Sequence, residues 1–348
     1  MKAAVLFGIR DLRVTDVKEE QLGPHDVRLA IAAVGLCGSD IHFFQEARIG
    51  AFDLVDPLVV GHEPSGVVVE TGAAVTRLKV GDRVAIEPNR PCGACPECLR
   101  GDYNVCENIG FMGMPPEPGC LAERAVVHER FAHPIPTTMS LEEAALLEPL
   151  SVVLWANTRM GGVRLADRVL VGGAGPVGIL AARVARAAGA AEVCVLDVDP
   201  ERLAIVAGEP RTTAVDVGGG WGAVDDDYDC YFECTNAQST LSEGLKHLKR
   251  RGRAVMVGVP PTSDIAVPTK DMRWRELTLA FSFRYADTWP RAIQLVATNV
   301  VGVKDLVTRR FALDDAPRAF EEAAAHRVGI KAIVVVGDAD QARASRAT

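Results

Sequence analysis

Apolar and polar residues alternate over short stretches from the N-terminus to about residue 90. Alternation with a period of two is typical of strands that bury one face. Turn-forming pairs such as Gly23-Pro24 and Gly81-Asp82 separate the stretches. The clearest stretches are 1–8, 27–33, 65–69 and 83–86. We therefore predict irregular, β-rich structure for this part of the chain.

A helical pattern with a proline inside it covers residues 141–160. Ser140 is a candidate N-cap, and acidic residues fill the first turn, where they favour a helix start. Pro149 disfavours helical geometry at Glu148. We therefore predict that the Glu148 carboxylate lies at a break between two helices, either as a functional group or simply as an acidic residue at a helix end.

A strand, a glycine-rich loop, a helix and a second strand follow one another between residues 168 and 197. The loop has the form Gly-x-Gly-x-x-Gly. Gly173 permits the tight turn, Gly175 lets a pyrophosphate approach the backbone, and Gly178 allows the helix to pack closely on the strand. The N–H groups at the helix N-terminus bind phosphate. Asp197 ends the second strand, where it accepts ribose hydroxyls and repels a 2′-phosphate, so the unit should prefer NAD(H) to NADP(H).

The rest of the chain continues the alternation of strands and helices. Further elements are expected as strands at 229–233, 254–257, 277–281 and 332–336, and as a helix around 239–248. Alternating strands and helices predict the α/β class, with a doubly wound parallel sheet.

Composition limits the kinds of partner. The chain has 348 residues, 48% hydrophobic and 24% charged, which is enough for two domains with cores of their own. Its formal net charge of −8 argues against a nucleic-acid-binding surface. The N-terminal apolar run soon reaches charged residues, and no apolar run is long enough to span a membrane. We expect a cytoplasmic protein with no nucleic-acid or membrane partner.

Four of the nine cysteines, Cys92, Cys95, Cys98 and Cys106, follow the pattern Cys-x₂-Cys-x₂-Cys-x₇-Cys. Nine cysteines are too few for a disulfide scaffold in a chain of this length. Four thiolates at this spacing can surround one zinc ion, and such a closed site is structural because no position is left for a substrate. A [4Fe–4S] cluster uses a similar run, normally with repeats or other spacings. We predict a structural zinc site.

A second set of possible metal ligands lies in two glycine-flanked stretches. The first stretch carries Cys37, Ser39, Asp40 and His42, and the second carries His62 and Glu63. A thiolate, an imidazole and a carboxylate from separate loops suit a catalytic zinc ion with one open position. A cysteine or histidine by itself, however, is more often structural.

Together these motifs resemble those of the zinc-containing medium-chain alcohol dehydrogenases, most closely the sorbitol/xylitol (polyol) dehydrogenase branch. The resemblance covers essentially the whole chain. The family motifs are 37–40, 61–63, 80–84, 173–178 and the four cysteines, and the branch motifs are 86–88, 148–152 and 283–290. Other alcohol dehydrogenases carry a further cysteine ligand near the position of Glu148, whereas this chain has no cysteine between Cys120 and Cys194.

The resemblance implies a particular domain organisation. A GroES-like, β-rich catalytic domain would cover residues 1–148, with the structural zinc lobe at about 90–108. A Rossmann NAD-binding domain would cover 149–282, and residues 283–348 would return to complete the catalytic domain. The short, glycine-rich segment 207–227 departs from relatives and leaves the third strand of the Rossmann sheet open. The family also implies a homo-oligomer, either a tetramer or a dimer.

The resemblance assigns roles to the residues of the catalytic site. Cys37, His62 and Glu63 would bind the catalytic zinc, with Glu148 bound directly or through water. Asp40 would orient His62. Ser39 and then His42 would carry the hydroxyl proton outward, the alternative being that His42 is only a surface residue.

The resemblance also implies contacts to substrate and cofactor. Phe111, Arg284 and Tyr285 would bind the substrate, the alternative being that Arg284 only pairs with a carboxylate. The cofactor contacts would come from Gly173, Gly175, Pro176, Val177, Gly178, Asp197, Arg202 and Val257.

The function implied is zinc-dependent transfer of a hydride from a secondary hydroxyl of a polyol to NAD⁺, giving a ketose. One alternative is a zinc-dependent dehydrogenase of another secondary alcohol, such as threonine or an aldose. The other is a protein that binds zinc and NAD without catalysis.

Overall fold

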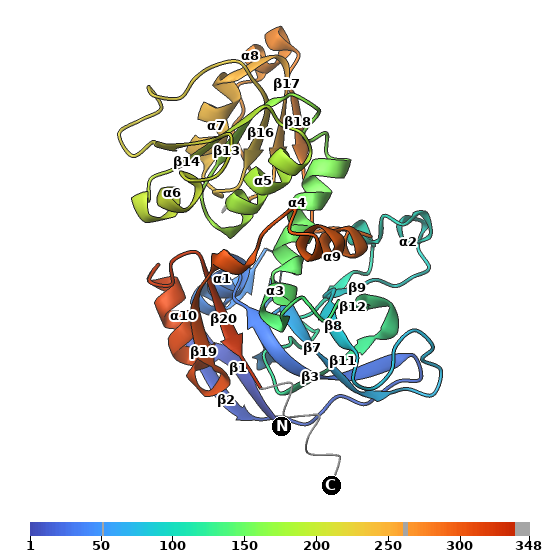
Figure 1. Cartoon of the computed structure of the whole chain (residues 1–348). Coiled ribbons are helices and arrows are strands. Elements are labelled where there is room, and N and C mark those ends of the chain that lie inside the picture. Colours follow the sequence, from blue (N-terminus) through green and yellow to red (C-terminus); the bar gives the residue numbers. More distant parts are fainter. Residues whose placement is uncertain (51, 260–263, 338–348) are drawn as a thin grey trace. The chain divides into compact units, whose positions relative to one another are not determined.

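The structure is a computed structural model that describes residues 1–50, 52–259 and 264–337 (Figure 1). These residues divide into two units. The first takes in Met1–Glu148, Trp289–Ala297 and the described residues from Val303 onward, and the second takes in Pro149–Thr288 and Thr298–Gly302. The chain therefore leaves the first unit after Glu148 and returns to it twice.

The first unit is built on a seven-stranded sheet that is mostly antiparallel. Its strands are β3 (Asp26–Gly35), β7 (Glu63–Thr71), β8 (Arg83–Ile86), β11 (Arg124–His128), β12 (Ala132–Pro134), β19 (Val307–Ala312) and β20 (Lys331–Val335). They lie in the order β12-β8-β7-β3-β20-β19, and β11 also pairs with β3. Apolar side chains such as Leu29, Val68 and Val334 form the core. A strand from the C-terminal part thus lies beside one from the N-terminal part.

Smaller elements surround this sheet. The remaining strands are β1 (Lys2–Gly8), β2 (Asp11–Asp16), β4 (Arg48–Ile49), β5 (Phe52–Asp53), β6 (Leu58–Val59), β9 (Asn89–Arg90) and β10 (Gly110–Phe111). The helices are α1 (Gly38–Glu46), α2 (Pro96–Arg100), α3 (Leu141–Ala145), α9 (Trp289–Ala297) and α10 (Ala316–Ala324). Short 3₁₀ turns occur at Tyr103–Val105, Glu129–Phe131, Lys304–Leu306 and Leu313–Asp315.

The second unit is a six-stranded sheet in which every pairing is parallel. Its strands are β13 (Arg168–Gly172), β14 (Glu192–Asp197), β15 (Thr212–Asp216), β16 (Tyr228–Glu233), β17 (Leu248–Met256) and β18 (Thr278–Phe281). Its helices are α4 (Leu147–Arg159), which begins in the first unit, α5 (Pro176–Ala187), α6 (Pro200–Val206), α7 (Gln238–Lys246) and α8 (Thr269–Arg275). The strands lie in the order β15-β14-β13-β16-β17-β18. The chain adds strands on one side of β13 up to β15 and then on the other side from β16, and sheets of this kind bind ligands at the point between β13 and β16.

The predicted α/β class and the parallel, doubly wound sheet are confirmed. The third strand, which the sequence left open, is β15, and it pairs with β14 at the sheet edge. The glycines that follow β15 belong to the connection to β16.

The predicted break in the helix at 141–160 exists, but it falls at Leu146 and not at Glu148. Helix α3 ends there, and α4 starts at Leu147. Pro149 is the third residue of α4, where an N–H group would have no partner within the helix in any case. Glu148 therefore lies in the first turn of a helix.

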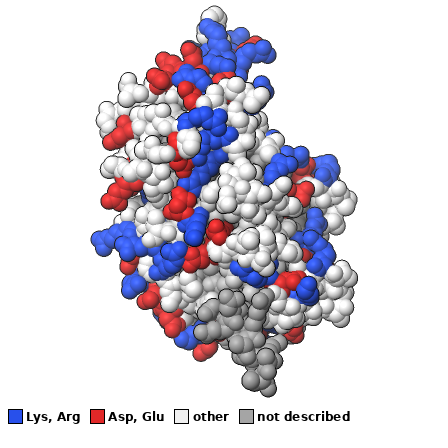
Figure 2. All heavy atoms as spheres, viewed as in Figure 1, with Lys and Arg blue, Asp and Glu red and all other residues white. Residues whose placement is uncertain are grey.

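Among the described residues, no helix is both long and apolar enough to cross a membrane. On the face that Figure 2 shows, acidic and basic side chains are interspersed among uncharged ones.

Candidate functional site

Three side chains of different chemistry converge where β3 ends and β7 begins. The Cys37 thiol, a ring nitrogen of His62 and a carboxylate oxygen of Glu63 all lie within 4.8 Å of one another. The antiparallel register causes this, because Gly35 stands opposite Glu63 and Cys37 follows as the N-cap of α1. We call Cys37, His62 and Glu63 the mixed donor cluster. His62 and Glu63 are buried, whereas Cys37 is partly exposed.

Asp40 holds two members of the mixed donor cluster at once. One of its carboxylate oxygens lies 3.0 Å from His62 Nδ1, and the other accepts a hydrogen bond from the Cys37 N–H at 3.1 Å. Burial lowers the pKa of His62, but the charge and hydrogen bond of Asp40 raise it, and the net pKa lies well above the ordinary value. The ring is therefore oriented with Nε2 left for a cation.

Glu63 is paired with a residue that the sequence did not single out, Lys331 at the start of β20. The Lys331 ammonium lies 2.6 Å from both carboxylate oxygens, and both side chains are buried. Burial lowers the pKa of Lys331, but the charges of Glu63 and Cys37 raise it, and the net shift is upward. The one available signal was a lysine at the head of an apolar strand, which does not identify a partner 268 residues away.

Phe111 and Glu148 belong to the surroundings of the mixed donor cluster. The Phe111 ring lies 5.2 Å from the His62 ring, at an interplanar angle of 50°. Glu148 is buried in the first turn of α4. Its charge contributes to the raised pKa of Lys331, after the larger effects of burial, Glu63 and Cys37. The Glu148 carboxylate is thus within electrostatic reach of the cluster.

Ser39 and His42 both lie on α1. Ser39 is half-buried, whereas His42 is exposed and its Nδ1 lies 3.4 Å from Glu46 Oε1. Residues three apart on a helix are neighbours on one face, so this pair leads from the region of Cys37 toward solvent.

A further buried carboxylate, that of Glu87, supports the strand pair that carries Phe111. Glu87 accepts a hydrogen bond from Asn89 Nδ2 at 3.1 Å and lies 3.3 Å from His133 Nε2. The His133 ring stacks on Trp289 at 5.3 Å, and Asn89 stands opposite Phe111 in the β9–β10 pair. In the sequence analysis the segment 86–88 is only a branch motif, and no role was predicted for Glu87.

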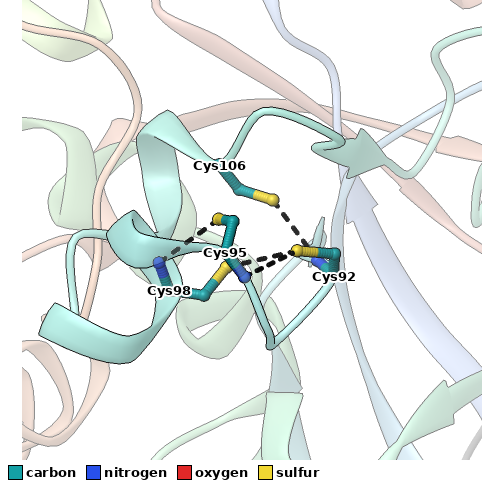
Figure 3. Close-up of side chains that lie close together, drawn as sticks. All are labelled: Cys92, Cys95, Cys98 and Cys106. Atoms are coloured by element: carbon teal, nitrogen blue, oxygen red, sulfur yellow. Dashed lines mark hydrogen bonds between the residues drawn. The ribbon is translucent and has the colours of Figure 1, made fainter.

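The four cysteines at 92–106 form a separate cluster (Figure 3), which we call the cysteine lobe. The Cys92 N–H donates to Cys106 Sγ at 3.3 Å, and the Cys95 N–H donates to Cys92 Sγ at 3.4 Å. Cys98 closes the ring, with its N–H 3.5 Å from Cys95 Sγ and its own Sγ 3.9 Å from Cys92 Sγ.

The charge state of the cysteine lobe fits a cation. Backbone N–H groups of Ala94 and Cys95 lower the pKa of Cys92 to about 6, whereas burial and neighbouring thiols raise that of Cys98 to about 12. Four thiolates thus need a positive charge among them before all can ionise. The lobe suits a closed zinc site, and the mixed donor cluster suits a zinc site with an open position.

The second unit presents the glycine loop as the N-terminus of α5. Gly173 has a φ of +97°. A Cβ on Gly178 would lie 1.8 Å from the Gly173 carbonyl oxygen, so only glycine fits there. Gly175 is the N-cap of α5, and Pro176 and Val177 form its first turn, which leaves backbone N–H groups available to phosphate.

Asp197 ties the loop to the end of β14. Its carboxylate accepts hydrogen bonds from the N–H groups of Ala174 at 2.6 Å, Val198 at 2.7 Å and Asp199 at 3.0 Å. Arg202, in the first turn of α6, lies 3.4 Å from the Asp199 carboxylate. The acidic residue that the sequence predicted for ribose is therefore fixed in position beside the loop.

The C-terminal ends of β16 and β17 carry Val257 and a buried acid that the sequence missed, Glu233. The Glu233 carbonyl accepts the N–H groups of Val257 and Gly258, both at 2.9 Å. Its carboxylate accepts the Thr235 N–H at 2.8 Å, and burial raises its pKa. Glu233 thus shapes the turn in which Val257 lies.

Arg284 and Tyr285 lie in the second unit, after β18. Arg284 has a φ of +48° and its guanidinium lies 4.9 Å from the centre of the Phe283 ring. Tyr285 is fully buried. Both residues therefore belong to the second unit, whereas the mixed donor cluster belongs to the first.

Comparison with known proteins gives the same division of the chain. Residues 23–137 match the family model of the alcohol dehydrogenase GroES-like domain, and residues 176–298 match that of the zinc-binding dehydrogenases. L-Arabinitol 4-dehydrogenase of Aureobasidium melanogenum is 39% identical over 89% of this chain and 87% of its own length. Sorbitol dehydrogenase of Rattus norvegicus is 38% identical over 97% of this chain and 96% of its own.

Solved structures agree along almost the whole chain. L-Idonate 5-dehydrogenase of Escherichia coli superposes with a TM-score of 0.89 at 27% identity, covering 96% of this chain and 97% of that one. 2R,3R-Butanediol dehydrogenase of Bacillus subtilis gives a TM-score of 0.85 at 28% identity, covering 97% and 99%.

Proposed function

The chain belongs to the zinc-binding dehydrogenases with a GroES-like domain, in their polyol branch, and we propose on this premise that it oxidises a secondary hydroxyl of a sugar alcohol to a ketose with NAD⁺. The observation that carries the proposal is the mixed donor cluster, in which Asp40 orients His62 beside Cys37 and Glu63. Sorbitol, xylitol or a similar polyol would be the substrate.

Oxidation of an alcohol removes a proton from oxygen and a hydride from carbon. Cys37, His62 and Glu63 would hold the catalytic zinc, with Glu148 as a further carboxylate that ligates directly or through water. When bound, zinc supplies a Lewis acid beside the substrate hydroxyl and so makes its proton easier to remove. The cysteine lobe would hold a second, structural ion.

The proton leaves along α1. Ser39 would accept it from the substrate hydroxyl, and His42 would pass it to solvent. The half-buried position of Ser39 and the exposed position of His42 on one helix face support this order. His42 Nδ1 lies 3.4 Å from Glu46 Oε1 at the exposed end of this route.

Substrate contacts would come from an apolar wall and from polar groups. Phe111, packed against His62, would form the wall. Arg284 and Tyr285 would bind the additional hydroxyls of a polyol, because a site without such groups leaves those hydroxyls unsatisfied.

The cofactor would bind at the glycine loop of the second unit. Gly173, Gly175, Pro176, Val177 and Gly178 would cradle the pyrophosphate, and Asp197 would accept ribose hydroxyls. Arg202 would line the adenosine end of the cofactor, and Val257 would line its nicotinamide end. The fixed carboxylate of Asp197 supports a preference for NAD⁺ over NADP⁺.

We further propose a cytoplasmic homo-oligomer, tetramer or dimer, without nucleic-acid or membrane partners. The net charge of −8 supports the absence of a nucleic-acid surface. The edge strand β18 supports self-association, because it ends in Phe281, a residue that is 57% exposed. The domain limits proposed remain 1–148, 149–282 and 283–348.

The test is reduction of NAD⁺ by a panel of polyols, with NADP⁺ and a strong chelator as controls. Chelator-sensitive, NAD⁺-dependent turnover of sorbitol, xylitol or galactitol is expected. Turnover of threonine or an aldose with no polyol turnover would overturn the roles of Arg284 and Tyr285. Binding of zinc and NAD⁺ without any turnover would identify a non-catalytic protein.

A further inference from the structure

We propose that Lys331 is a positioning residue of the mixed donor cluster, which shares the Glu63 carboxylate with the bound ion and so limits how tightly that ion is held. The inference rests on the proposed function, in which Cys37, His62 and Glu63 hold the catalytic zinc. It assigns to the C-terminal strand a part in the chemistry of a site made by the N-terminal half.

The pairing of Lys331 with Glu63 is close, with its hydrogen bond made to Oε1, whereas the buried Oε2 has no hydrogen-bond partner among the described residues. The ammonium lies 2.6 Å from each carboxylate oxygen, and the exposed fractions are 3% for the Lys331 side chain and 1% for that of Glu63. Lysine is almost never buried without a partner. The residues that follow it in β20, Ala332, Ile333 and Val334, are buried and apolar. Packing alone would therefore favour an apolar residue at position 331, so the ammonium is present for Glu63.

The backbone leaves room for this pair at one place. A Cβ on Gly35 would lie 1.9 Å from Glu63 Oε2 and 3.1 Å from Lys331 Cε. Gly35 stands opposite Glu63 on one side and opposite Ile333 of β20 on the other. The ion pair thus fills the gap that the missing side chain leaves between β7 and β20, two residues before Cys37.

Lys331 is also the positive charge among several negative ones. The charges of Glu63, Cys37 and Glu148 all act on its ammonium. A divalent ion beside Cys37 and His62 would meet a Glu63 carboxylate already engaged by Lys331. The carboxylate then neutralises the ion only in part, and an ion with less charge donated to it is a stronger Lewis acid and is held less tightly.

The test is release of the metal from Lys331→Met, a variant of similar length without charge. The chain is loaded with Zn²⁺ or Co²⁺, and release to a chelator is followed over time. The phase that belongs to the mixed donor cluster is identified as the one missing in Cys37→Ser. We expect this phase to slow by about tenfold in Lys331→Met, the lower end of what outer partners of metal ligands do. The Co²⁺ absorption bands should shift as well, because Glu63 then binds the ion fully.

The matched control is Arg253→Met. Arg253 is a buried cation of the second unit, where its guanidinium pairs with Asp167 and donates to the Gly161 carbonyl. Its loss should lower stability but leave both release phases and the Co²⁺ bands unchanged. This separates a specific effect of Lys331 from the general cost of unpairing a buried charge.

Each result decides the matter. Unchanged release and bands in Lys331→Met, or faster release, would overturn the proposal. If Lys331→Met does not fold, Lys331→Gln removes the charge with less disturbance and is judged by the same criteria. If the Cys37→Ser variant keeps every release phase of the wild-type chain, the proposed function is refuted instead, because the mixed donor cluster then holds no ion.

Discussion

The cysteine lobe and the mixed donor cluster offer metal ligands in two different ways. The lobe draws its four thiols from one short segment, and backbone N–H groups of that same segment are their hydrogen-bond donors. The mixed donor cluster draws on the N-cap of α1 and the start of β7, and partners from elsewhere hold its members: Asp40 holds His62 and the Cys37 backbone, and Lys331 holds Glu63. A closed site can thus be built locally, whereas a site with an open position depends on the surrounding fold to hold its ligands.

Replacing a ligand of the mixed donor cluster should have the largest effect. His62→Ala is expected to lower kcat/KM for the preferred polyol by at least about a thousandfold, because the Lewis acid is lost. Metal analysis should find one ion per chain, that of the lobe. Loss of both ions would show that the two sites are not independent and would break the comparison.

Asp40→Asn should have the next largest effect. The amide keeps the size of the side chain but cannot supply the negative charge that strengthens His62 as a zinc ligand. We expect the affinity of the mixed donor cluster for zinc to fall by about 10- to 100-fold. Competition with a fluorescent chelator measures the zinc affinity. The control is Asp82→Asn, which changes a loop carboxylate that accepts a hydrogen bond from the Lys79 N–H. An unchanged affinity would mean that the fold positions His62 without Asp40.

A change in the cysteine lobe should alter stability more than activity. Cys95→Ser is expected to lose the lobe's ion and about 3 kcal/mol of unfolding free energy, the contribution of a ligand present well above its dissociation constant. Activity per folded chain should fall by less than about tenfold, since the lobe supplies no open position. Urea unfolding and initial rates on the same sample measure both quantities. A larger loss of activity than of stability would contradict the division of roles.

The smallest effect concerns thiol reactivity in the metal-free chain. Cys92 is exposed and its pKa lies at about 6, so its alkylation should be fast at neutral pH and should slow as pH falls through about 6, where the thiolate gains a proton. Cys120 should stay unmodified, because burial raises its pKa and blocks access. Mass spectrometry of iodoacetamide-treated samples distinguishes the two. Equal labelling of Cys92 and Cys120 would show that the fold opens when metal is removed.

The contrast between a site built from neighbouring residues and a site built from distant ones also separates the features that the sequence predicts from those that it does not. The glycine loop, the four-cysteine spacing and ten of the twenty strands among the described residues were predicted, because each depends on neighbours in the chain. The segments 83–86 and 229–233 show this, since they match β8 and β16 to within one residue. The helix break was placed two residues late, because Pro149 is tolerated in a first turn and does not mark the end of α3.

Contacts between distant segments were not predicted. Lys331 has no local pattern that points to Glu63, and Glu87 gives no sign of its contact with His133, because register and burial arise only when the sheet forms. The assignment of Cys37, His62 and Glu63 depended on resemblance for the same reason. Residues 338–348, part of the predicted C-terminal return, lie outside the described residues.

The position of β20 has a consequence for synthesis on the ribosome. All strands of the second unit lie between residues 168 and 281, so its sheet can form before the last part of the chain emerges. The last part of β3, by contrast, waits for β20, because β11 pairs only with residues 26–30 of that strand, and until then Glu63 lacks the Lys331 ammonium. We expect the nascent chain to fold its middle first and to complete the surroundings of the mixed donor cluster only after β20 has emerged and paired with β3.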